Sequence, residues 1–303
     1  MLLIADSGGT KTSWCLLDGA KSHRLDVETQ GISPLHQSDE HIKAILTLEL
    51  IDVLDKVEFG KGECLEVFFY GSGCVGDAKE HLAVMIAKIL EQKLGMTGDR
   101  MTVCVESDLL GAARALCGNK KGIACILGTG ANSCMYDGNE IVKNIPPLGY
   151  ILGDEGSGAV LGKLFLNAMF KERLPEQLKE AFLSEMQLSY GDIINKVYRQ
   201  PLANRFLAST SVFIRSRMEV YPELKKLVIG NFRDFFRNNV ARYCQTTDAN
   251  AAVMECHFIG SIAQTYDKEL REAAAIEGFR VGRIQKSPLE GLIRFHDKKN
   301  TNR

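Results

Sequence analysis

The sequence has no excess of charge of either sign. Its 37 lysine and arginine residues are matched by 38 aspartate and glutamate residues, which gives a formal net charge of −1 at pH 7. Proteins that bind nucleic acids or anionic membranes usually carry a surplus of basic residues, because these neutralise the partner's phosphates. We therefore expect neither a nucleic-acid partner nor a membrane partner.

Long hydrophobic runs are also missing. The amino terminus has no basic segment, and it reaches a carboxylate at Asp6 after a short apolar stretch. A secretory signal has a basic start and a longer apolar region, and a membrane-spanning helix needs about 20 apolar residues, which no run approaches. The sequence thus predicts a cytoplasmic protein without a membrane segment.

Closely spaced cysteine pairs are absent too. The nine cysteines include no C-x-x-C pair, and their number is odd. Several of them, such as Cys104 and Cys125, lie within apolar segments that are typical of strands. We therefore expect buried, reduced thiols, and neither a disulfide framework nor a metal cluster.

The chain does contain two successive α/β patterns. It has 303 residues, more than the roughly 100–200 of a typical domain. Three strands followed by alternating helices and strands fill the first half. The pattern restarts with strands at Ile123–Leu127 and Ser133–Tyr136, followed by a mostly helical region and two strand–helix pairs. This order indicates α/β layers with mixed sheets, and we predict two domains, residues 1–116 and 117–303.

The two halves share a strand–turn–strand unit at an offset of 119 residues. Aligning Thr129 with Thr10 also pairs Gly128 with Gly9, Cys134 with Cys15, Asp137 with Asp18 and Gly138 with Gly19. Agreement at so many positions without gaps indicates an internal duplication. Two unrelated hairpins that happen to share common turn residues are the alternative.

Glycine-rich turns follow three apolar strands, at residues 6–12, 128–130 and 260–261. Such turns expose backbone N–H groups that no Cβ shields, which is what a phosphate chain needs. The two turns related by the duplication could bind a triphosphate from both sides. Asp6, at the end of its strand, offers the hard oxygen ligand that hydrated Mg²⁺ uses.

Two further glycine-rich segments resemble nucleotide motifs but are incomplete. Gly71–Gly76 has the spacing of a dinucleotide fingerprint, but the next strand does not supply the acidic residue expected about 20 residues later. Gly158–Lys163 has one residue too few between its glycines for a Walker loop, and Leu164 follows in place of Ser or Thr. We interpret neither segment as a nucleotide site.

Four motifs in a fixed order resemble a known family. They are Asp6–Thr12 (DSGGTKT), Glu106–Asp108 (ESD), Leu127–Ser133 (LGTGANS) and Gly149–Gly158 (GYILGDEGSG). Together they resemble the N-acetylglucosamine kinase-like branch of the actin/hexokinase/Hsp70 ATPase superfamily, also called the benzoyl-CoA reductase/hydroxyglutaryl-CoA dehydratase activator type. The resemblance implies a two-domain actin-like ATPase (ribonuclease H-like) α/β fold, with a duplicated mixed sheet and an interdomain cleft.

The resemblance also implies roles for individual residues. The first phosphate loop would comprise Gly8, Gly9, Thr10, Lys11 and Thr12, and the second Gly128, Thr129 and Gly130; Gly260 and Ser261 would contact adenosine. Asp108 matches the family's catalytic base. Phosphoryl transfer independently calls for a carboxylate that accepts the proton of the attacking hydroxyl. A helix N-cap is the alternative role for Asp108.

The sugar would be contacted by Ser33, Gly73, Asp108, Gly149, Tyr150 and Asp154. Asp154 and its neighbour Glu155 could instead stabilise the start of the following helix. Ser33 stands where many relatives have asparagine, and a tryptophan that some amino-sugar kinases carry is missing near Tyr150. The motifs therefore do not determine the sugar.

These observations favour an ATP- and Mg²⁺-dependent kinase for a sugar hydroxyl, with an amino sugar such as N-acetylglucosamine or glucosamine as the expected substrate. The alternative is an ATPase activator of a 2-hydroxyacyl-CoA dehydratase or benzoyl-CoA reductase system. Such activators need paired cysteines that hold an iron–sulfur cluster across a dimer, and the cysteine spacing argues against this. A sugar-responsive regulator would need a DNA-binding module, for which the motif positions leave no room. A homodimer is a reasonable expectation, although the sequence does not determine it.

Overall fold

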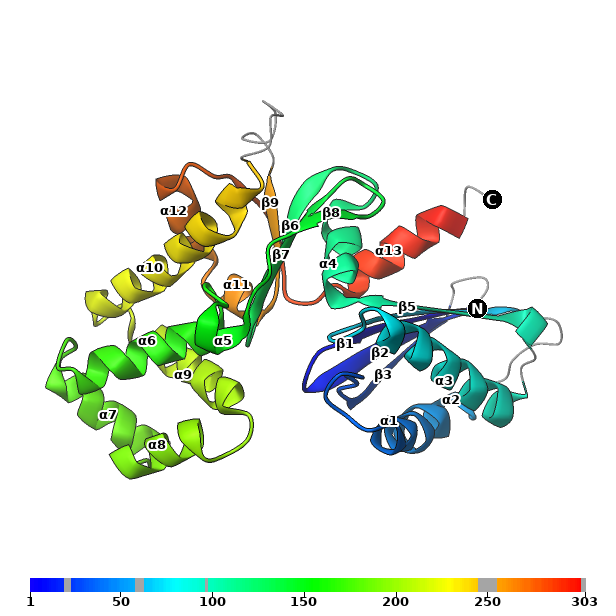
Figure 1. Ribbon diagram of the computed structural model, residues 1–303, viewed down its shortest axis with the longest axis horizontal. Helices are drawn as coiled ribbons and strands as arrows, with labels where there is room; N and C mark the ends of the chain where they lie inside the picture. Colours follow the sequence, from blue (N-terminus) through cyan, green and yellow to red (C-terminus); the bar gives the residue numbers. More distant parts are fainter. Residues whose placement is uncertain (19–22, 58–62, 96–97, 245–254, 301–303) are drawn as a thin grey trace. The chain divides into compact units, whose positions relative to one another are not determined.

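Two five-stranded mixed sheets form the framework of the protein (Figure 1). The computed structural model describes residues 1–18, 23–57, 63–95, 98–244 and 255–300. The chain divides into unit 1, Met1–Gly118 with Ser287–Arg303, and unit 2, Asn119–Lys286. No helix within the described part of the chain is both long and apolar enough to span a bilayer.

The sheet of unit 1 has the strand order β3-β2-β1-β4-β5. Its strands are β1 Leu2–Ser7, β2 Lys11–Leu17, β3 Arg24–Gln30, β4 Leu65–Gly71 and β5 Met101–Ser107. β1 pairs antiparallel with β2 and parallel with β4. Because β1 is the central strand, both of its faces are covered, and this explains why Leu2–Ala5 is a continuous apolar run rather than an alternating one.

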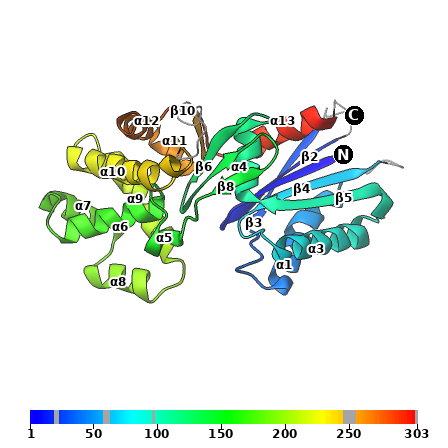
Figure 2. The ribbon, with the colours of Figure 1, turned by 45° about the horizontal axis from the view of Figure 1, so that its top comes forward.

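Helices cover both faces of this sheet (Figures 1 and 2). On one face lie α1 Asp39–Ile45, the π-helix Leu46–Ile51 that continues it into α2 Asp52–Leu54, and α3 Asp77–Leu94. On the other lie α4 Asp108–Cys117 and α13 Leu289–Asn300, and a 3-10 turn, Gly98–Arg100, precedes β5. The core of unit 1 includes the single tryptophan, Trp14, which is fully buried and donates from Nε1 to Thr29 Oγ1 at 3.0 Å.

The sheet of unit 2 has the order β10-β9-β6-β7-β8. Its strands are β6 Gly122–Leu127, β7 Ala131–Tyr136, β8 Ile141–Asn144, β9 Cys256–Ile259 and β10 Val281–Gln285. Reading each sheet from its central strand gives the same plan: an antiparallel meander on one side and two parallel strands on the other. This shared topology supports the internal duplication. Gly19 of the aligned pairs lies outside the described residues.

Helices account for most of unit 2. They are α5 Gly149–Leu152, α6 Gly158–Phe170, α7 Glu176–Met186, α8 Tyr190–Tyr198, α9 Ala203–Arg217, α10 Pro222–Asn238, the 3-10 turn Val240–Arg242, α11 Ser261–Thr265 and α12 Asp267–Ile276. They enclose an aromatic core that includes Phe165, Phe182 and Phe213, whose ring centroids lie 5.1–5.9 Å apart.

The last helix does not follow the predicted domain boundary. Residues 287–303 were expected in the second domain, yet they belong to unit 1. The physical reason is the surface that α13 buries. Its Leu292 and Phe295 are covered, and His296 Nε2 lies 2.8 Å from the hydroxyl of Tyr70 on β4. The first boundary is close to the expected one, between Gly118 and Asn119.

The cysteines are mostly inside the units, as expected. Cys15, Cys74, Cys125, Cys134 and Cys256 are buried, three others are half-buried, and Cys64 is exposed. Among the residues that the structure describes, no group of three or more His, Cys, Asp or Glu side chains could hold a metal ion on its own.

Candidate active site

The first glycine turn of unit 1 is closed by two buried hydroxyl groups. Gly8 N donates to Lys11 O at 3.0 Å. Ser7 Oγ and Thr12 Oγ1 lie 2.7 Å apart and join the ends of β1 and β2. The tips of the turn, Gly8 to Thr10, are exposed. These hydrogen bonds hold the base of the turn, while the backbone at its tip faces solvent. Lys11 leaves the turn on β2 and pairs with Glu28.

The segment after β3 packs directly on this turn. Gly31 N donates to Thr10 O at 3.1 Å, and a Cβ on Gly31 would lie 2.4 Å from Gly8 O. The hydroxyl of Ser7 accepts from Ile32 N and donates to Ile32 O, both at 2.9 Å. Only glycine permits this close approach, so the predicted phosphate turn and the predicted sugar segment form one structure.

Two predicted sugar contacts of unit 1 come together. A Cβ on Gly73, whose φ is +78°, would lie 2.9 Å from Ser33 Oγ. Ser33 is 5% exposed, and its hydroxyl has no hydrogen-bond partner within the described part of the chain. Gln37 holds this segment in place, since its side chain accepts from Ser33 N and donates to Gly31 O, both at 2.8 Å. A buried hydroxyl without a protein partner is free to bind a water molecule or a polar group of a ligand.

Asp108 begins α4 at the carboxyl end of β5. The cap of this helix is Ser107, whose Oγ accepts from Leu110 N at 3.2 Å, so the capping alternative for Asp108 is wrong. Asp108 Oδ1 accepts from Leu109 N at 2.8 Å. Burial raises the pKa of Asp108, although the hydrogen bond from Leu109 lowers it. Burial and the charges of Asp108 and Glu106 together raise the pKa of the Cys74 thiol to about 12.

Asp6 lies on β1, and its electrostatics link it to Asp108. Burial raises the pKa of Asp6 to about 7; a hydrogen bond from Ser287 lowers it, the charge of Asp108 raises it, and Lys11 lowers it. Two carboxylates whose ionised forms are disfavoured are suited to a divalent cation. Mg²⁺ usually keeps several waters and uses one or two carboxylates with substrate phosphates. Asp6 therefore fits a hydrated Mg²⁺ better than a closed protein cage.

The second glycine turn, in unit 2, is held by hydrogen bonds to the first residues of a helix. Gly128 N donates to Gly130 O at 2.9 Å, and the carbonyls of Gly128 and Thr129 accept from Gly158 and Ala159 at the start of α6, at 2.8 and 3.1 Å. Ser157 caps α6 through Val160 N. Because the carbonyls are held by the helix, the turn has a defined orientation, with Thr129 exposed at its tip.

The predicted adenosine turn lies against this turn. Gly260 has a φ of +126°, and a Cβ there would lie 2.2 Å from Leu127 O and 3.2 Å from Gly128 N. Gly260 N donates to Gln285 O at 2.9 Å. Ser261 follows as the exposed first residue of α11. The contact requires glycine for two reasons. A side chain would clash with the backbone of β6, and a residue with a Cβ rarely adopts this φ.

Asp154 also lies beside the second turn. Its Oδ2 would be 3.2 Å from a Cβ on Gly130, and its carboxylate accepts from the backbone of Ala131. Burial raises the pKa of Asp154, the bond from Ala131 lowers it, and Glu155 raises it. Its φ of +56° lies in the left-handed region, where aspartate is tolerated at a cost that functional sites often carry.

The rest of the fourth motif has structural partners. Gly156 N donates to the buried Asn231 Oδ1 at 2.9 Å. Glu155 accepts from Asn238 at 2.9 Å, so its side chain connects the motif to α10. Gly149 and Tyr150 form the start of α5, and Tyr150 O accepts from Lys163 at 2.8 Å.

The glycines of the two incomplete motifs make close packing contacts. Gly158 and Gly162 lie within α6, and a Cβ on Gly162 would lie 2.0 Å from Leu207 O of α9, so these glycines let two helices approach. In the other segment, Gly73 approaches Ser33 closely, and Ser72 N donates to Ser7 O at 3.1 Å.

Three residues that support the site were not predicted: Gln37, Ser107 and Ser287. Ser107 precedes a helix and could have been recognised as its cap. The contact between Ser287 and Asp6 joins residues 281 positions apart, and no local pattern reveals such a pair.

Solved structures resemble the whole chain, whereas no protein-family model and no curated protein matches it. A candidate N-acetylglucosamine kinase from Porphyromonas gingivalis is 42% identical, with a TM-score of 0.87 over 99% of this chain and 100% of that one. A second candidate N-acetylglucosamine kinase, from Chromobacterium violaceum, is 19% identical, with a TM-score of 0.70 over 97% and 98% of the two chains. A ROK family glucokinase from Streptomyces griseus, solved with glucose and AMPPNP, is 14% identical, with a TM-score of 0.52 over 98% of both chains.

The duplicated five-stranded sheets and these likenesses define the actin-like ATPase fold. The identity and coverage of the Porphyromonas protein place the chain more narrowly: it belongs to the N-acetylglucosamine kinase-like family of this fold.

Proposed function

We propose that the protein is an ATP-dependent kinase that phosphorylates a hydroxyl group of an amino sugar, with N-acetylglucosamine as the first candidate. The observation that carries the proposal is the pair of carboxylates Asp6 and Asp108 in unit 1, whose pKa values are both raised by burial. Asp6 lies near the carboxyl end of β1 and Asp108 directly follows β5 in the same sheet. Perturbed pKa values of carboxyl groups at such positions are typical of catalytic and cation-binding sites. The name given to the Porphyromonas relative supports the choice of sugar.

Unit 1 supplies the acceptor side of the proposed reaction. The unpartnered hydroxyl of Ser33 would bind a sugar hydroxyl, and Gly73 leaves room beside it. Asp108 would accept the proton of the attacking hydroxyl, which is easier for a carboxylate with a raised pKa because it is a stronger base. Gly149, Tyr150 and Asp154 of unit 2 remain predicted sugar contacts.

The glycine turns supply the donor side. We assign Gly8–Thr12 and Gly128–Gly130 to the phosphates of ATP, because both turns are fixed by hydrogen bonds on one side and exposed at their tips. Gly260 and Ser261 would contact adenosine. Mg²⁺, held through water by Asp6, would neutralise phosphate charge. A homodimer and a cytoplasmic location stay predictions from the sequence.

A coupled ADP-release assay tests the proposal. Mg–ATP is supplied with glucose, glucosamine, N-acetylglucosamine, N-acetylmannosamine or N-acetylmuramic acid, and the phosphorylated product is identified by mass spectrometry. We expect sugar-dependent ADP release with an amino sugar. ADP release that does not depend on any sugar, together with iron in anaerobically purified protein, would favour the activator alternative, which the buried cysteines already disfavour.

A further inference from the structure

Ser287 is the residue at which the chain enters unit 1 for the second time, directly after Lys286 of unit 2. Its hydroxyl donates to Asp6 Oδ2 at 3.3 Å. The same oxygen accepts from Leu289 N at 3.3 Å, in the first turn of α13. Ser287 Oγ thus accepts from the backbone amide and donates its single hydrogen to the carboxylate.

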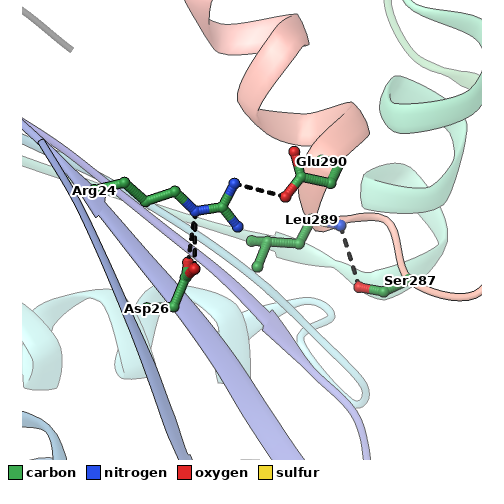
Figure 3. Close-up of polar contacts among 5 residues, drawn as sticks. All are labelled: Arg24, Asp26, Ser287, Leu289 and Glu290. Carbon is green, nitrogen blue, oxygen red and sulfur yellow. Dashed lines mark hydrogen bonds and ion pairs between the residues drawn. The ribbon is translucent and has the colours of Figure 1, made fainter. Parts of the chain in front are cut away.

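The start of α13 is itself tied to the sheet of unit 1, as Figure 3 shows. Glu290 pairs with Arg24 at 2.7 Å. Arg24 Nε donates to both carboxylate oxygens of Asp26 at 2.9 Å. These groups are partly exposed, so the pairs contribute little to stability. They lie at the same helix turn in which Leu289 N donates to Ser287.

We propose that Ser287 is a positioning residue that orients the Asp6 carboxylate toward a hydrated divalent cation. The inference rests on the cation role proposed for Asp6. A carboxylate that reaches Mg²⁺ only through water must hold its oxygens in a defined direction, because Mg²⁺ demands near-ideal octahedral geometry of its waters. Ser287 binds one oxygen, Oδ2, and so restricts the rotation of the carboxylate. Ser287 touches neither the sugar nor the reacting phosphate in this assignment.

The test uses the whole chain and ADP as the probe, with binding followed by calorimetry in EDTA and over a series of Mg²⁺ concentrations. For Ser287→Ala we expect the Mg²⁺ concentration that half-saturates the gain in ADP affinity to rise about three- to ten-fold, which corresponds to the loss of one hydrogen bond of ordinary strength. ADP binding in EDTA should not change. Ser287→Thr should restore the wild-type Mg²⁺ dependence, because it keeps the hydroxyl.

Ser38→Ala is the matched control. Ser38 caps α1 in the same unit by accepting from His41 N, so its loss removes a helix cap without changing Asp6. An equal rise in the Mg²⁺ requirement of Ser38→Ala and Ser287→Ala would mean that loss of a serine hydroxyl at any helix start of unit 1 suffices, and it would overturn the inference.

Asp6→Asn separates this inference from the proposed function. If Asp6→Asn raises the Mg²⁺ requirement and Ser287→Ala does not, the inference fails while the cation role of Asp6 stands. If neither variant changes the Mg²⁺ requirement, both the inference about Ser287 and the cation role of Asp6 are wrong. In the Asp6→Asn background, a further Ser287→Ala change should have no added effect, whereas an added effect as large as in the wild type would contradict the proposed contact.

Discussion

The hydroxyl groups of Ser7 and Thr12 lie 2.7 Å apart, and both side chains are fully buried. This pair closes the hairpin that carries the first glycine turn. Ser7 also holds both backbone polar groups of Ile32, so one hydroxyl connects the first glycine turn with the segment that leads to Ser33.

Ser7→Ala should therefore lower both stability and ligand binding. The change leaves Ile32 N buried without its partner, which costs about 1–3 kcal/mol. We expect a lower midpoint in urea unfolding and weaker binding of Mg–ATP by calorimetry. Ser209→Ala is the control, because its exposed hydroxyl donates to Phe206 O and water can replace that bond. Equal stability losses in the two variants would contradict the special role of Ser7.

Asp108→Asn should abolish most turnover and leave the fold intact. A positioned general base contributes about 10²–10⁴-fold, while Ser107 continues to cap α4. Removing a buried carboxylate with a raised pKa should raise the melting temperature at neutral pH. Steady-state kinetics with the sugar from the screen and the calorimetric Kd of Mg–ATP measure the two effects. Near-normal turnover would make Asp154 the next carboxylate to test.

The pKa of Asp6 predicts how stability depends on pH without ligands. Folding raises this pKa from 3.8 to about 7, so the folded protein holds the proton more tightly than the unfolded chain. Stability should then fall as the pH rises between these two values. Asp6→Asn cannot ionise, so it should lose part of this slope and be more stable than the wild type at pH 8. Melting temperatures from pH 4 to pH 8 test this, and identical slopes would contradict it.

Much of the fold was predictable because patterns within short segments of the sequence determine its strands and turns. The apolar run before Asp6, the Gly128–Gly130 turn and the repeated spacing are features of short segments, and they gave strands, turns and the duplication correctly. The position of α13 was not predictable, because the sequence of an amphipathic helix does not reveal which apolar surface it covers. Ser287 was missed for a related reason: only the fold brings it to Asp6.

Gly260→Ala should destabilise unit 2 and weaken nucleotide binding. The added Cβ would lie 2.2 Å from Leu127 O at a φ of +126°, so β6 or the turn must shift. Gly230→Ala is the matched control, since its Cβ meets no atom within 4 Å in the middle of α10. Alanine in a helix interior should add about 1 kcal/mol of stability. Thermal melts with and without Mg–ADP distinguish the two, and a wild-type melting temperature for Gly260→Ala would refute the prediction.

The contact between Tyr70 and His296 spans 226 residues of sequence, and it affects the order in which the protein can fold during synthesis. Unit 2 is continuous in the chain, whereas unit 1 lacks α13 until the whole of unit 2 has been synthesised. At about 5–20 residues per second, the surface that α13 covers stays open on the ribosome for on the order of ten seconds or more after α4 has emerged. In nascent chains that are stalled before α13 is made, unit 2 should therefore resist protease better than unit 1.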